Sequence, residues 1–166
     1  MRRIVLALGL LMASAGALAA QEDERTLPPF TVVDAGGRAL RSTTLGAGRR
    51  TVMVFVRPSC RPCEQLLNAL TRLPDGAAGS GLVVVVEGSA DAAAEFTARG
   101  LPKALANVPV VADVKGEGWA GLELNALPAV LGVEGTRIAW SHTGVPDRGL
   151  LESLMRTWLG DTAVRR

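Results

Sequence analysis

Hydrophobic residues along this chain form two continuous runs separated by a helical pattern. Residues 51–56 and 82–87 are rich in valine, with Phe55 in the first run. Runs of this length, dominated by β-branched side chains, predict strands that are buried on both faces. Between them, leucines recur at helical spacing until Pro-Asp-Gly at 74–76 ends the pattern. The pattern therefore predicts a strand–helix–strand unit, which is right-handed by default.

Weaker patterns predict elements on both sides of this unit. An Asp-Ala-Gly-Gly turn signal separates strand-like segments at 30–33 and 38–40, which predicts an N-terminal hairpin. The last helix, at 147–159, has an apolar face that includes Leu150 and Trp158. The elements expected between them are a helix at 92–99 capped by Ser89 or Asp91, a strand at 108–112, a short helix at 116–124, and strands at 129–133 and 137–140. This order predicts an α/β domain.

The first 19 residues have the composition of an export signal. Arg2 and Arg3 precede an apolar run, and Ala17-Leu18-Ala19 places small residues at both positions that a signal peptidase reads. The apolar run is short for a membrane span, so cleavage after Ala19 is favoured over an uncleaved membrane anchor. We therefore expect a periplasmic protein.

Length and charge limit the remaining possibilities. The 166 residues suit one folded domain, which we place at 29–160, after a loose lead-in at 20–28 and before a tail at 161–166. Without Arg2 and Arg3, 16 of the 18 basic residues remain against 16 acidic ones, so the mature chain is formally neutral. Basic residues interleaved with aromatic ones are missing from the sequence, which argues against a nucleic-acid partner.

The residues with chemical potential lie where the first buried strand gives way to the helix. Cys60 and Cys63 form a Cys-x-x-Cys motif and are the only cysteines in the sequence. With Ser59 as the helix N-cap and Pro62 in the first turn, Cys60 would lie at the positive end of the helix dipole, where a thiolate is favoured. Cys63 is about one helical turn away, near enough to attack a mixed disulfide on Cys60. We therefore predict that Cys60 attacks and that Cys63 resolves.

Two other interpretations of the cysteine pair are weaker. A closed zinc site would need carboxylates or a second chain, because His142 is the only histidine. A purely structural disulfide would contribute little, since closing so small a loop removes little entropy from the unfolded chain. The motif therefore favours redox chemistry that needs neither a metal nor a cofactor.

Two arginines flank the predicted nucleophile. We expect Arg57 and Arg61 to lower the pKa of the Cys60 thiol through their charge. By stabilising the thiolate, Arg61 would also make the cysteine pair a stronger oxidant. Pro62, in contrast, resembles the reducing C-G-P-C arrangement. The sequence therefore leaves the direction of the redox reaction open.

Three segments resemble exported thioredoxin-fold proteins of the TlpA/ResA type. They are PPFTVVDAGGRAL, VFVRPSCRPCEQL and LPAVLGVEGTRIAWSHTG, and the resemblance covers residues 29–159. It implies a thioredoxin-like α/β fold: a central mixed sheet flanked by helices, with an N-terminal β-hairpin and a small β/α insert. It also implies a thiol–disulfide oxidoreductase whose partner is a client protein carrying a disulfide or a dithiol.

The resemblance also assigns a role to Pro128. It matches the cis-proline that the family places beside the Cys-x-x-Cys motif, and a cis bond would offer the backbone of Leu127 as an unpaired edge for a client polypeptide. A trans proline at the start of an ordinary strand is the alternative. Two positions depart from the family: Ser59 replaces an aromatic residue, and Val54 replaces the buried acid of cytosolic thioredoxins. The second departure argues against a fast, general reductase.

Two functions of different kinds follow. The favoured one is an exported, monomeric thiol–disulfide oxidoreductase with a dedicated client and a membrane-bound thiol electron donor or acceptor. The alternative is an accessory protein similar to MauD, which would bind and mature a periplasmic enzyme subunit. The similarity to MauD rests on the P-S-C-x-P-C-E spacing and on the run GVPDRGLLESL at 144–154. Loss of function on replacing Cys63 would favour the first, and tolerance of that replacement the second.

Overall fold

The two valine-rich runs lie side by side at the centre of the fold. The structure is a computed structural model that describes residues 25–46, 50–73 and 81–160. The runs form β3 (Arg50–Val56) and β4 (Leu82–Glu87), which pair in parallel. Helix α2 (Arg61–Leu70) follows β3, so the predicted strand–helix–strand unit is confirmed. The predicted helix stop at 74–76 lies outside the described residues.

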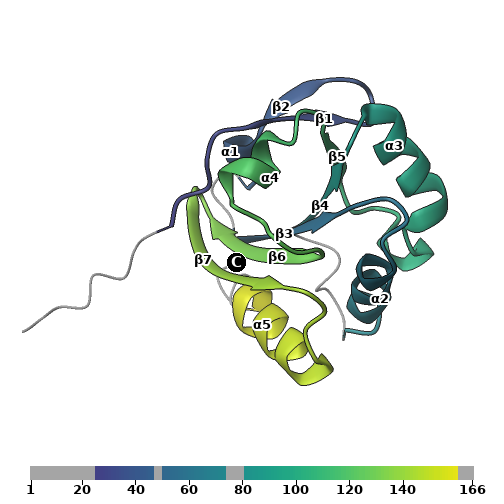
Figure 1. Ribbon diagram of the computed structural model, residues 1–166. Helices are drawn as coiled ribbons and strands as arrows, with labels where there is room; N and C mark the ends of the chain where they lie inside the picture. The colour runs from purple at the N-terminus through teal and green to yellow at the C-terminus, as the bar shows by residue number, and fades with distance from the viewer. Residues whose placement is uncertain (1–24, 47–49, 74–80, 161–166) are drawn as a thin grey trace, which may run out of the picture.

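The described residues form one mixed sheet of seven strands. Its other strands are β1 (Thr31–Asp34), β2 (Ala39–Arg41), β5 (Val110–Asp113), β6 (Ala129–Glu134) and β7 (Arg137–Thr143). The order across the sheet is β2-β1-β5-β4-β3-β6-β7 (Figure 1). β1 and β2 form the predicted antiparallel hairpin, and β6 and β7 form a second one beside β3. β5 is parallel to β4 and antiparallel to β1, so the expected insert contributes a strand to the interior of the sheet.

Helices cover both faces of the sheet, each over its own hydrophobic core. The remaining α-helices are α1 (Ser42–Leu45), α3 (Ala90–Glu95), α4 (Glu117–Gly121) and α5 (Arg148–Gly160). Helix α3 continues as a π-helical turn at Phe96–Gly100, and a 3₁₀ turn follows at Lys103–Leu105. α2, α3 and α5 pack on one face, where Leu66, Ala93 and Met155 share a core with the sheet. The segment before β1 and the residues after α4 cover the other face, through Leu27 and Leu122. None of the helices in the described ranges is long and apolar enough to span a membrane.

The described end of the lead-in packs against the sheet, although the sequence predicts a loose segment there. Thr26 forms a β-bridge with Arg137, and the Leu27 N–H donates a hydrogen bond to the Thr136 carbonyl at 2.7 Å. The side chain of Leu27 is buried. The physical reason is that the edge strand β7 offers unpaired backbone groups, and a single leucine in a polar segment has apolar surface to bury. Residues 1–24, with the predicted export signal, lie outside the described residues.

Three local expectations are refined by the structure. Ser89, not Asp91, caps α3, because its hydroxyl accepts a hydrogen bond from the Ala92 N–H at 3.1 Å. Leu150 does not join the buried face of α5 and is 38% exposed. β7 extends to Thr143, so His142 lies within the strand, opposite Val130. Strand and helix ends depend on pairing partners elsewhere in the chain, so local patterns place them poorly.

Candidate redox site

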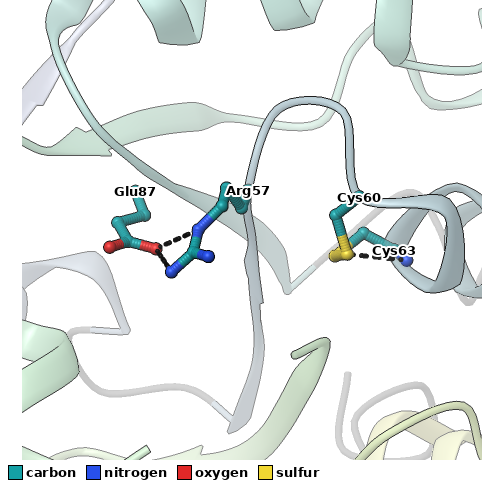
Figure 2. Close-up of a disulfide and its surroundings, with 4 residues drawn as sticks. All are labelled: Arg57, Cys60, Cys63 and Glu87. Carbon is teal, nitrogen blue, oxygen red and sulfur yellow. Dashed lines mark hydrogen bonds and ion pairs between the residues drawn. A yellow bond between two sulfur atoms is a disulfide. The ribbon is translucent and has the colours of Figure 1, made fainter. Parts of the chain in front are cut away.

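The two cysteines form a disulfide at the start of α2 (Figure 2). Their Cα atoms are 5.2 Å apart. Cys60 is half-buried, whereas Cys63 has no exposed surface. A reagent or a client sulfur can therefore reach Cys60 from solvent but not Cys63.

Cys60 itself is the N-cap of α2, which corrects the assignment of Ser59. The Cys60 sulfur accepts a hydrogen bond from the Cys63 N–H at 3.2 Å, which is the interaction that a capping oxygen would make. Pro62 lies in the first turn, as predicted. Ser59 is exposed and has φ +59°, a left-handed conformation that turns the chain from β3 into the helix. The helix therefore begins one residue later than expected, and Cys60 lies at the cap instead of in the first turn.

The buried face of α2 holds this motif against the sheet. Leu66, Leu67 and Leu70 are almost entirely inaccessible and share a core with β3 and β4. Glu64 is exposed in the first turn, where its charge complements the helix dipole. The position of both sulfurs is therefore set by hydrophobic packing behind them.

The surroundings of Cys63 are apolar. Val54 and Val56, which lie in the same core, are both fully buried. Ser42, Thr51 and Asp113 are the buried polar or charged residues in the part of the chain that the structure describes. Of these only Asp113 is acidic, and it follows Ala112, which faces the Cys63 core, so the alternation of the strand turns it to the other face. The described structure therefore places no buried acid beside Cys63.

The two arginines take different positions. Arg61 is the first residue of α2, is exposed, and makes no hydrogen bond or ion pair with any described residue. Arg57 points away from the disulfide toward Glu87 (Figure 2). Its Nε and Nη2 lie 2.8 and 2.7 Å from the same oxygen, Oε2, of Glu87. Its guanidinium also lies over the ring of Trp119, 5.7 Å from the centroid. The structure thus keeps Arg61 next to Cys60 and directs the charge of Arg57 elsewhere.

Leu127 and Pro128 directly precede β6. The bond between them is cis, and the Pro128 carbonyl accepts a hydrogen bond from the Gly144 N–H at 2.7 Å. Leu127 and Cys60 are both partly buried against the same core. Neither backbone group of Leu127 is hydrogen-bonded to a described residue. Among the described residues, the N–H and the C=O of Leu127 are therefore both unpaired beside the core that contains the disulfide.

Sequence reasoning missed two acidic residues at this end of the sheet, Glu87 and Asp113. Burial raises the pKa of Asp113, although its Oδ2 accepts hydrogen bonds from the N–H groups of Gly118 and Trp119 at 3.0 and 3.1 Å. Its Oδ1 is buried and has no hydrogen-bond partner among the described residues. A signal was present in the sequence, because Glu87 and Asp113 are the last residues of the buried strands β4 and β5. The carboxyl ends of parallel strands meet at one edge of a sheet, where such residues gather.

Comparison with known proteins identifies the fold. Neither a protein-family model nor a curated protein matches the chain. Among solved structures, a thioredoxin-like protein from Porphyromonas gingivalis is 19% identical with a TM-score of 0.64, covering 81% of this chain and 92% of that one. The chain has the thioredoxin fold. A thiol:disulfide interchange protein DsbE from Chlorobium tepidum has the same thioredoxin fold, with 20% identity, a TM-score of 0.65, and coverage of 82% and 97%. A secreted disulfide oxidoreductase from Mycobacterium tuberculosis is 20% identical with a TM-score of 0.59, and the match covers 77% of this chain and 95% of that one.

The different exposure of the two sulfurs gives a first test. In the reduced protein, Cys60 is expected to react with iodoacetamide well before Cys63, because Cys60 is accessible and caps a helix while Cys63 is fully buried. Brief alkylation followed by peptide mass mapping measures the order. Preferential labelling of Cys63 would show that the assignment of the two cysteines is reversed.

Proposed function

We propose that this protein is a thiol–disulfide oxidoreductase that reduces or exchanges a disulfide in a client protein. The observation that carries the proposal is the Cys60–Cys63 disulfide at a helix N-terminus, with one sulfur accessible and the other buried. A helix N-terminus stabilises a thiolate, and the Cys63 N–H already points at the Cys60 sulfur. An accessible thiolate with a buried second thiol one turn away is the arrangement that disulfide exchange needs.

The reaction proceeds in two exchanges. The Cys60 thiolate attacks one sulfur of the client disulfide, whose S–S bond breaks, and the other client sulfur leaves as a thiolate that takes up a proton from solvent. Cys63 then loses its proton and attacks the Cys60 sulfur, which releases the second client thiolate. The client disulfide is reduced by two electrons, and Cys60–Cys63 becomes the oxidised pair. The reverse sequence oxidises a client dithiol.

Leu127 and Pro128 supply the docking edge in this proposal. The free N–H and C=O of Leu127 can pair with an extended client segment, as a strand adds to the edge of a sheet. Leu127 packs on the same core as Cys60, so a client segment bound there would bring its sulfur close to the nucleophile. This edge would align the client backbone without selecting its side chains.

The cellular context is part of the same proposal. The sequence of residues 1–19 supports export to the periplasm, where the protein would act as a monomer. A membrane-bound thiol protein would supply or accept the electrons, because each turnover leaves Cys60 and Cys63 in the opposite redox state. The secreted disulfide oxidoreductase from Mycobacterium tuberculosis supports the assignment to an exported class.

A second candidate function is a MauD-like accessory role, in which binding matters and turnover does not. Val145 and Leu150, within the run that resembles MauD, are 40% and 38% exposed. Exposed large apolar side chains are common at protein–protein contacts. In this function the two side chains would contact an enzyme subunit during its maturation.

Replacing Cys63 separates the two functions. Cys63→Ser is expected to abolish multiple turnover on a protein disulfide, while Cys60 still attacks and accumulates as a mixed disulfide, because nothing remains to resolve it. Turnover is measured with a model disulfide protein, and the adduct is detected on a non-reducing gel. Full client maturation in the exporting host with Cys63→Ser would instead support the accessory function.

The trapped adduct also tests the docking edge. Amide hydrogen exchange at Leu127 is expected to slow in the mixed disulfide of Cys63→Ser relative to the free variant, because the amide gains a partner. The Gly144 amide serves as the internal control, since it is already bonded to Pro128. Unchanged exchange at Leu127 would remove this segment from the docking site.

A further inference from the structure

Charged side chains mark the ends of three neighbouring parallel strands. Glu87 ends β4 directly beside Asp113, which ends β5. Arg57 follows Val56 of β3, and Val56 pairs with Val86, so Arg57 comes next to Glu87 across the sheet. These residues lie on the face that α4 covers. Cys63 packs in the core on the opposite face.

The Arg57 guanidinium is held from two sides. One carboxylate oxygen of Glu87 contacts both Nε and Nη2 of Arg57, and the guanidinium lies over the ring of Trp119. Trp119 is in turn fixed by its backbone N–H, which donates to the buried carboxylate of Asp113. The Arg57 side chain is 55% exposed, so the ion pair adds little to the stability of the fold. The ion pair instead determines where the Arg57 guanidinium points, and Arg57 is only three residues before Cys60.

From this arrangement we infer that Glu87 is a positioning residue that keeps the charge of Arg57 away from the Cys60 sulfur. The inference rests on the proposed function, since that reaction begins at the Cys60 thiolate. A cation near a thiolate favours the reduced, ionised form and makes the pair a stronger oxidant. By holding Arg57 on the other side of β3, Glu87 leaves the thiolate less stabilised and the pair more reducing than two flanking arginines would make it.

The other charged groups near the motif make no hydrogen bond or ion pair with the Glu87 side chain in the described part of the chain. Arg61 and Glu64 lie in the first turn of α2, and neither makes an ion pair with a described residue. His142 is on β7, opposite Val130. Asp113 and Glu117 lie on the α4 side, with Arg57. We expect none of them to move when Glu87 is changed, so their contribution should be the same in every variant compared below.

A double-mutant cycle on a Cys63→Ser background tests the inference, because only Cys60 then titrates as a thiol. Glu87→Gln is expected to lower the midpoint of the thiolate absorbance titration by about half a pH unit, as Arg57 becomes free to approach the sulfur. Arg57→Gln alone is expected to leave the midpoint almost unchanged. In the double variant the effect of Glu87→Gln is expected to disappear, because the charge that it releases is gone.

Two results would overturn the inference. One is an unchanged midpoint in Glu87→Gln. The other is an equal shift with and without Arg57, which would mean that the charge of Glu87 acts on Cys60 directly. Glu95→Gln, which removes the acid of the Glu95–Arg99 pair in the α3 region, is the matched control and is expected to have no effect. If the Cys63→Ser protein traps no client disulfide, the proposed function fails; if trapping occurs but the cycle shows no coupling, only the role of Glu87 fails.

Discussion

Replacing Cys60 with serine is expected to abolish disulfide exchange completely. A serine hydroxyl is not ionised at neutral pH and cannot form the mixed disulfide. Cys63 cannot substitute for it, because Cys63 has no exposed surface and lies on the buried face of α2, in the core shared with β3. Turnover of a model disulfide protein should fall to the uncatalysed background, and no client adduct should appear on non-reducing gels.

Cys63→Ser is the matched control for this experiment. Both variants lose the same disulfide, so a shared loss of stability cannot explain a difference between them. Cys63→Ser should accumulate the client adduct, whereas Cys60→Ser should not, and the remaining Cys63 thiol should resist alkylation until the protein unfolds. An adduct formed through Cys63 in the Cys60→Ser protein would contradict the assigned roles.

Leu67→Ala is expected to cause a large loss of stability. Leu67 is fully buried in the core that holds α2 against the sheet. Truncating a buried leucine removes its transfer free energy and leaves a cavity, which lowers the free energy of unfolding by about 2–5 kcal/mol. Urea unfolding of the oxidised protein measures the loss as a lower midpoint with an unchanged slope. Because α2 carries both cysteines, Cys63 should also become easier to alkylate after reduction.

Leu150→Ala is the control for that loss. Leu150 is also a helical leucine, but it is 38% exposed near the start of α5, so its truncation should change the free energy of unfolding by less than about 0.5 kcal/mol. Equal losses in the two variants would show that α2 is not held by the packing of Leu67. Unchanged reactivity of Cys63 in Leu67→Ala would separate the stability of the helix from the shielding of the thiol.

The strand and helix around the cysteines were accessible to sequence reasoning because their signals are local. The valine-rich runs, the leucines at helical spacing and Pro62 in the first turn all act over a few residues. The error at the N-cap was also local: Ser59 is a good capping residue, yet it occupies the left-handed turn, and the cap falls to Cys60. The side-chain preference of serine favours Ser59 as the cap, whereas the backbone angles of the turn decide it.

By itself the sequence determined the Cys-x-x-Cys pair, its place between a buried strand and a helix, and the order of elements of an α/β domain. Only the tertiary structure decided where the charges act. Arg57 and Glu87 are 30 residues apart in the chain, and the pairing of β3 with β4 brings them together. The tertiary structure also decided that Leu27 is buried and that Asp113 accepts a hydrogen bond from the Trp119 N–H. Short-range patterns follow from the geometry of single helices and strands, whereas the direction of a charge depends on partners that the fold supplies.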